Sequence, residues 1–114
     1  GCEQGAPCTP LPPPVQVTHG ARGTAGMSHG LSDFCAQEEM QRYTGYWWSP
    51  CSEWLAFQET DERHIPEFTI VEHTAPRAAD ALEVHRYPFS GGPNPVVRLG
   101  VVPAAGGAAA APLW

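Results

Sequence analysis

Hydrophobic and polar residues alternate in several short stretches along the middle of the chain. A period of two is typical of β-strands that bury one face. These stretches are rich in β-branched and aromatic residues, and Gly, Pro and polar residues separate them. The predicted strands are Val15–Thr18, Leu31–Ala36, Tyr46–Trp48, Trp54–Thr60, Glu67–His73, Leu82–Phe89 and Val96–Val102. Short strands at this spacing predict an all-β protein, either a sandwich, a barrel or a propeller.

One stretch has the composition of a helix rather than a strand. Residues Gln37–Arg42 (QEEMQR) are good helix formers, and only about one or two helical turns fit before Thr44. The segment His19–Gly30 contains four glycines and is predicted to be a loop. The predicted fold class is therefore all-β with one short acidic helix inserted.

The two ends of the chain differ in composition from the middle. Residues 1–14 are rich in proline and are predicted to be an irregular lead-in or a loop insertion. Residues 103–112 form a low-complexity Ala/Gly tract. Its run of alanines is too short to form a stable helix, so a loop is expected there. Residues 113–114 are expected to begin another strand, which leaves residues 15–102 as the informative region.

The net charge is −6, and all 6 basic residues are arginines. An acidic chain without a basic run is a poor ligand for nucleic acid, so no nucleic-acid partner is expected. No apolar run approaches the roughly 20 residues that cross a bilayer, and no signal peptide is recognised. Because the chain starts at Gly1 and stops at Trp114, we expect both ends to be internal to a longer protein, and localisation is not predicted.

The four cysteines are Cys2, Cys8, Cys35 and Cys51. Their spacing does not match a zinc site, and no histidine completes one. Cys2 and Cys8 lie in the proline-rich segment and are expected to be exposed. Cys35 and Cys51 lie in apolar surroundings, where cysteine usually packs as a small hydrophobe. We expect neither a metal site nor a cofactor.

Residues Gly26–Gly30 (GMSHG) match the nucleophile motif G-x-S-x-G. That motif requires a strand before it and a helix after it, whereas a glycine-rich loop precedes Ser28. The chain is also too short for the sheet of an α/β-hydrolase. Ser28 is therefore not expected to be a nucleophile, and no catalytic residue is predicted in this chain.

Two longer motifs carry a specific resemblance. Trp48-Ser49-Pro50, followed by Leu55-Ala56-Phe57, resembles the hairpin of a propeller blade. Residues 34–50 (FCAQEEMQRYTGYWWSP) resemble the signature of the dipeptidyl peptidase IV branch of the prolyl oligopeptidase family. Residues 17–20, 28–31, 57–62, 85–91 and 94–101 resemble the surrounding strands of that family in the same order. A blade takes about 40–50 residues, so the resemblance over residues 15–102 implies a partial β-propeller of about two blades.

The resemblance implies a function for the short acidic helix. In this family, paired glutamates on that helix hold the free α-ammonium group of the peptide substrate, and by motif they are Glu38 and Glu39. Arg42, three and four residues further along, either orients these glutamates or is an exposed helix charge. The family's catalytic serine, aspartate and histidine belong to a C-terminal α/β-hydrolase domain that is absent here. The implied parent is a serine-type dipeptidyl peptidase, and many relatives dimerise.

Two carboxylates suit an ammonium group because together they can accept all three of its N–H donors. The residues alone do not establish this, because neighbouring residues do not share a helix face. They converge on one ligand only if the helix is short and its end points into a cavity. Two alternatives stay open. The parent is a relative that lost its serine and works as a binding or accessory subunit, or the chain is a propeller interaction module with an accidental acidic pair.

Overall fold

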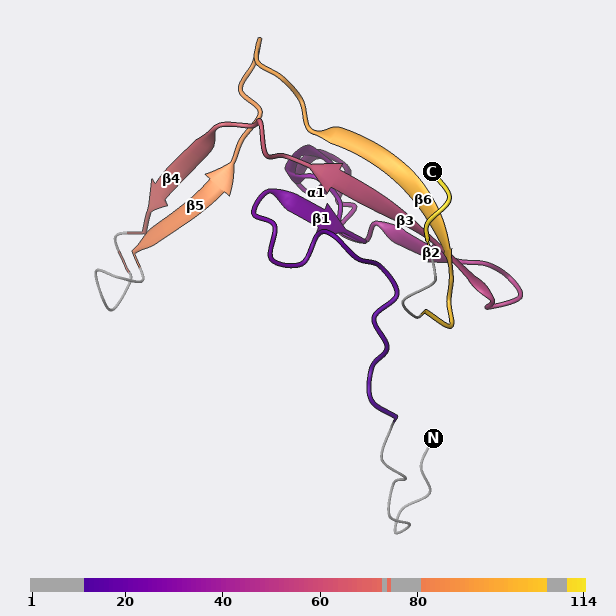
Figure 1. Cartoon of the computed structure of the whole chain (residues 1–114). Helices are drawn as coiled ribbons and strands as arrows, with labels where there is room; N and C mark the ends of the chain where they lie inside the picture. Colours follow the sequence, from indigo (N-terminus) through magenta and orange to yellow (C-terminus); the bar gives the residue numbers. More distant parts are fainter. Residues whose placement is uncertain (1–11, 73, 75–80, 107–110) are drawn as a thin grey trace.

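The computed structural model describes residues 12–72, 74, 81–106 and 111–114. These residues form six short strands and one helix (Figure 1). In chain order they are β1 (Met27–His29), α1 (Phe34–Met40), β2 (Tyr46–Trp48), β3 (Trp54–Asp61), β4 (Glu67–Val71), β5 (Leu82–Arg86) and β6 (Val96–Pro103). The predicted class, all-β with one short helix, is confirmed.

Strand β3 is the centre of a four-stranded antiparallel sheet. Its whole length pairs with β6 on one edge, with Trp54 opposite Pro103 and Asp61 opposite Val96. On the other edge, β1 pairs with the end of β3 and β2 pairs with its beginning. Strands β1 and β2 therefore lie end to end along the same edge of β3.

The segment between β1 and β2 leaves the sheet and returns to it at almost the same place. The Gly30 amide donates to the Gln58 carbonyl (2.9 Å), and the Gln58 amide donates to the Gly45 carbonyl (2.7 Å). The Gly45 amide donates in turn to Gly30 (3.0 Å), so the edge of the sheet is continuous across the gap. Residues 31–44, called the insertion below, therefore project from the sheet, and they carry α1.

The base of the insertion is narrow enough to require glycine. A Cβ atom at Gly45 would lie 2.9 Å from both the carbonyl carbon and the oxygen of Leu31. Real side chains do not approach a backbone this closely, so any other residue would push the two legs of the insertion apart. Glycine here serves close backbone approach rather than a special dihedral angle.

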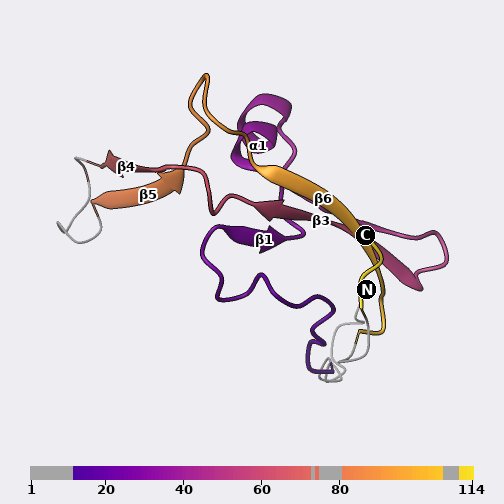
Figure 2. The same ribbon diagram turned by 45° about the horizontal axis from the view of Figure 1, so that its top comes forward.

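The two faces of β3 have different neighbours, because side chains alternate along a strand. Phe57 and Glu59 share one face, where the Phe57 ring contacts His29 (5.1 Å between ring centroids) and Trp114 (5.6 Å). Gln58 and Thr60 share the opposite face and hydrogen-bond to the insertion. Figure 2 shows α1 on one side of the β3–β6 pair and the segment that precedes β1 on the other.

Strands β4 and β5 form a separate two-stranded hairpin that stands apart from the main sheet (Figure 1). All five residues of β4 are exposed. At the base of the hairpin, the Tyr87 ring contacts Phe34 of α1 edge-on at 5.4 Å, and Arg86 donates to the Ile65 carbonyl at 2.8 Å. The foot of the hairpin is therefore attached to the start of the helix.

The hydrophobic core is small, and much apolar surface is exposed. The buried apolar residues of the described part are Ala36, Phe57, Ile65 and Val102. Large side chains on the sheet edges and faces, such as Trp48 at 58% and Leu99 at 58%, remain exposed. Repeat units bury their faces only against their neighbours, so this surface is what a partial propeller presents.

Five of the predicted strands are present, as β2 to β6. The segment Val15–Thr18 was predicted to be a strand and is not one; the Gln16 side-chain amide donates instead to the Thr18 carbonyl at 2.8 Å. The predicted loop 19–30 contains β1, because the end of β3 offers an edge with which Met27–His29 pair. Ser28 is therefore a strand residue opposite Thr60. His73, the last residue of one predicted strand, lies outside the described residues.

The helix begins three residues earlier than predicted. We expected a strand over residues 31–36, but the Asp33 carboxylate accepts a hydrogen bond from the Ala36 amide (3.3 Å) and starts α1 at Phe34. The helix ends at Met40, because Gln41 takes a left-handed conformation (φ 50°, ψ 32°). Both changes follow from capping.

The expected burial of two cysteines was wrong. Cys35 and Cys51 are both exposed. Cys35 lies on the outer side of α1, whose buried residue is Ala36, and Cys51 lies in the turn between β2 and β3. Cys2 and Cys8 lie outside the described residues.

Candidate functional site

The helix that carries the acidic pair is held by polar contacts at both ends. Asp33 caps its N-terminus, and the Gln37 side-chain amide donates to the Ser32 carbonyl at 2.7 Å. At the other end, the Arg42 backbone amide donates to the Ala36 carbonyl at 3.1 Å. A helix of seven residues is too short to persist alone in water, so these contacts and its attachment to the sheet determine its position.

Glu38 and Glu39 lie in the second half of α1, and both are exposed. Within the described residues, neither carboxylate takes part in an ion pair or in a side-chain hydrogen bond. A simpler interpretation of two adjacent glutamates is a solvated acidic pair near a helix start, where the helix dipole favours negative charge. The structure places the pair towards the C-terminal end, where the dipole disfavours it. Helix stability therefore does not account for two carboxylates at these positions.

Arg42 lies beyond the end of the helix. Its guanidinium donates from Nη1 to the Gln58 side-chain oxygen at 2.9 Å, and the described residues include no ion pair between Arg42 and Glu38 or Glu39. Pairing at helical spacing requires both residues to be in the helix. An orienting role for Arg42 by direct contact with the glutamates stays a prediction.

Asp33 offers a direct test of how α1 is held. We expect Asp33→Ala to destabilise the helix by about 1 kcal/mol, because one amide at the N-terminus loses its acceptor. Asp33→Asn should behave like the original residue, since asparagine caps equally well. Hydrogen exchange of the peptide that covers residues 33–42 measures the effect. Equal exchange in all three proteins would contradict the role of the cap.

A polar hollow lies beside the start of α1. It is lined by Ser28, Leu31, Ser32, Phe34, Gln37, Glu62, His85 and Arg86. Burial raises the pKa of the Glu62 carboxyl, and the nearby negative charge of Asp33 raises it further, against an opposing effect of Arg86. The hollow is lined by residues of both α1 and the foot of the β4–β5 hairpin, which meet at the contact between Phe34 and Tyr87.

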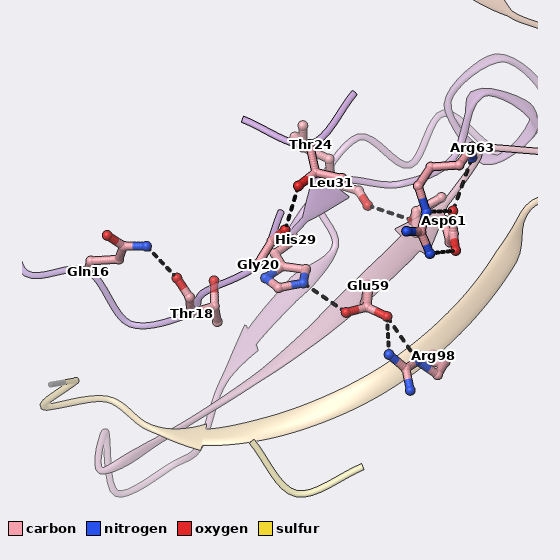
Figure 3. A network of polar contacts seen from close by, with 11 residues as sticks. Gln16, Thr18, Gly20, Thr24, His29, Leu31, Glu59, Asp61, Arg63 and Arg98 are labelled. Carbon is pink, nitrogen blue, oxygen red and sulfur yellow. Dashed lines mark hydrogen bonds and ion pairs between the residues drawn. The ribbon is translucent and has the colours of Figure 1, made fainter. Parts of the chain in front are cut away.

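A second polar cluster joins three strands on the opposite face of the sheet (Figure 3). The Glu59 carboxylate on β3 accepts hydrogen bonds from Nε (2.9 Å) and Nη2 of Arg98 on β6. Its other oxygen lies 3.0 Å from Nε2 of His29 on β1. Trp114 stacks over the Arg98 guanidinium, 4.2 Å from the ring centroid, a cation–π contact. We refer to Glu59, Arg98 and His29 as the cross-strand cluster.

The cross-strand cluster stabilises the ionised form of Glu59. Burial by itself raises the pKa of this carboxyl, but hydrogen bonds from Arg98 and His29, together with the Coulombic attraction of those groups, outweigh burial and lower the pKa below its ordinary value. The cluster cannot be recognised in the sequence alone, because 30 and 39 residues separate Glu59 from its partners. The only local signal was strand alternation, which places Glu59 on the same face as Phe57.

Neither a cluster of metal-ligating side chains nor a helix suited to span a membrane is found in the described part of the chain. There, no group of three or more His, Cys, Asp or Glu side chains is placed to hold a metal ion. The helices among the same residues do not reach the length and apolar character that a bilayer span requires.

A four-stranded antiparallel sheet that leaves apolar surface for its neighbours is the unit, or blade, from which a β-propeller is built. The family model described as the dipeptidyl peptidase IV (DPP IV) N-terminal region matches residues 10–112. The chain belongs to this family, as the motif in residues 34–50 had predicted. The prediction that this chain is a partial β-propeller is therefore confirmed by the fold and by the family assignment.

Individual relatives agree with this assignment. The chain is 38% identical over 97 residues to dipeptidyl peptidase 8 of Mus musculus, covering 70% of this chain and 10% of that protein. It is 32% identical over 95 residues to prolyl endopeptidase FAP of Homo sapiens, covering 82% and 12%. The crystal structure of Porphyromonas gingivalis dipeptidyl peptidase 4 superposes with a TM-score of 0.60 at 25% identity, covering 70% and 11%. The chain thus spans about a tenth of the length of the relatives it matches.

Proposed function

We propose that this chain is the propeller portion of a serine-type dipeptidyl peptidase, in which Glu38 and Glu39 bind the free N-terminal ammonium group of a peptide substrate. The observation that carries the proposal is the state of these two carboxylates. They are consecutive, exposed and without an ion pair among the described residues, on an insertion that is closed tightly at its base. The family assignment makes a peptide amine the expected ligand.

The role of the pair is to bind and position substrate, not to transfer protons. A dipeptidyl peptidase must place the second peptide bond from the N-terminus at its nucleophile. An anionic site at a fixed distance from the nucleophile selects that bond, because the ammonium group anchors one end of the substrate. Under this proposal the nucleophile, base and oxyanion hole lie in an α/β-hydrolase domain of the same protein, and the intact protein forms homodimers.

The proposal predicts a strong preference for free over blocked N-termini. Charge-assisted hydrogen bonds contribute about 1.5–3 kcal/mol each, and an acetylated amine loses the charge as well as donors. In the full-length protein that carries this sequence, we expect kcat/KM for a free-amine dipeptidyl substrate to exceed that for its N-acetylated form by roughly 100-fold or more. The measurement is steady-state turnover of a matched pair of chromogenic substrates.

The other outcomes separate the alternatives. Equal turnover of both substrates would reject the amine-binding role and favour an endopeptidase, an activity that the name of the FAP relative indicates for that protein. Binding of free peptides without turnover, in a full-length protein that lacks the catalytic serine, would identify an accessory subunit. Neither binding nor turnover would leave a propeller interaction module.

A further inference from the structure

We propose that Gln58 and Thr60 are positioning residues, which connect β3 to both legs of the insertion and so hold the acidic pair in place. The proposal rests on the proposed function of Glu38 and Glu39 as the amine site. It concerns residues that lie outside the helix and outside the motif that marks it.

A continuous chain of hydrogen bonds carries the proposal. Arg42 Nη1 donates to Gln58 Oε1 (2.9 Å), and Gln58 Nε2 donates to Thr60 Oγ1 (2.9 Å). Thr60 Oγ1 in turn donates to the Leu31 carbonyl (3.4 Å). Leu31 begins the insertion and Arg42 lies in its returning leg. The chain of bonds therefore reaches both legs from adjacent positions on one face of β3.

The burial of Gln58 and Thr60 shows that packing alone does not explain them. Gln58 is 4% exposed and Thr60 is 1% exposed. Their cross-strand neighbours on β6 are apolar, with Leu99 opposite Gln58 and Val97 opposite Thr60. On the other edge, Ser28 of β1 lies opposite Thr60. An apolar side chain would fill these positions equally well, and buried polar groups are kept satisfied by specific partners. Here those partners belong to the insertion.

The contact also keeps the Arg42 charge away from the acidic pair. Arg42 follows Glu39 by only three residues, and a guanidinium released from Gln58 is a competing cation for either carboxylate. Loss of the contact therefore has two effects. It loosens the insertion, and it frees a cation that competes with the ammonium group of the substrate.

The test compares three substitutions in the full-length protein. Gln58→Met removes both contacts and keeps a similar volume, whereas Gln58→Glu keeps an acceptor for Arg42 and accepts a hydrogen bond from the Thr60 hydroxyl instead of donating one to it. Gln16→Met is the matched control, because the Gln16 amide hydrogen-bonds only locally and is exposed. We expect Gln58→Met to raise KM for a free-amine substrate roughly 10-fold with kcat nearly unchanged, since one hydrogen-bond network is lost. Gln58→Glu should restore the original KM, and Gln16→Met should not change it.

Hydrogen exchange supplies a readout that does not depend on substrate. Gln58→Met should speed exchange in the peptide covering residues 31–44 about 10-fold, while peptides from β3 and β6 exchange as before. If Gln58→Met does not fold, Thr60→Val, which keeps the shape of threonine, should show the same local acceleration.

Two outcomes would overturn the proposal. The first is unchanged KM and unchanged exchange of residues 31–44 in a folded Gln58→Met protein. The second is an equal loss in Gln58→Met and Gln58→Glu with faster exchange throughout the sheet, which would mark a purely structural role. If the original protein does not distinguish free from acetylated substrates, the amine site fails instead, and the exchange data still decide whether Gln58 and Thr60 hold the insertion.

Discussion

Replacing both glutamates of the acidic pair, Glu38→Gln with Glu39→Gln, is expected to lower kcat/KM for free-amine dipeptidyl substrates by about 10²–10⁴-fold in the full-length protein. Glutamine keeps the size of each side chain and removes its charge. Each carboxylate contributes charge-assisted hydrogen bonds worth about 1.5–3 kcal/mol to an ammonium group, and about 1.4 kcal/mol corresponds to a factor of ten. Each single substitution should therefore lose about 10–100-fold. Steady-state kinetics with free and acetylated substrates measures both effects.

A matched control distinguishes binding from general effects of charge. Glu53 is also an exposed glutamate, in the turn between β2 and β3, and Glu53→Gln should leave kcat/KM unchanged. For N-acetylated substrates, the double variant should have the same kcat/KM as the original protein, because those substrates do not present an ammonium group. Retention of full activity on free-amine substrates, or an equal loss on both kinds, would contradict the amine site.

Removing the centre of the cross-strand cluster should have the largest effect on stability. We expect Glu59→Leu to reduce the free energy of unfolding of this region by about 2–4 kcal/mol, because hydrogen bonds from Arg98 and His29 are lost and the nearly buried His29 ring loses its partner. The comparison is Glu67→Gln, which breaks an ion pair with Arg86 at a side chain that is 59% exposed. That surface pair should contribute at most about 1 kcal/mol. Urea unfolding followed by tryptophan fluorescence measures both variants.

The same carboxyl predicts a dependence on pH. The pKa of Glu59 in the folded chain lies below its ordinary value of 4.5. Its contribution to stability is therefore fully present above pH 4.5 and is lost as the pH falls through the lower folded value. Glu59→Gln, which does not titrate at this position, should show a smaller loss of stability on acidification than the original protein. Parallel pH profiles for the two proteins would show that Glu59 is not responsible.

Much of the fold followed from local patterns. Strand β2 has the predicted bounds, and β3 and β6 each extend only one residue beyond theirs, because alternation and turn residues act over a few positions. The start of α1 was misjudged, since Asp33 was included in a strand although its side chain is a good helix cap. The prediction that Cys35 is buried was wrong for a related reason. Which side of a seven-residue helix is covered depends on the sheet against which the helix packs.

The candidate site, too, was only partly predictable from the sequence. The residue types and order within positions 34–50 were enough to identify the family and to single out Glu38 and Glu39, because a motif is a property of neighbouring residues. The contacts that attach the insertion to β3, and the contact of Glu59 with Arg98 in the cross-strand cluster, join positions 16 to 39 residues apart. They exist only because β3 pairs with strands from both sides of it in the chain, and strand pairing at that distance is selected by the packing of the whole sheet rather than by local preference.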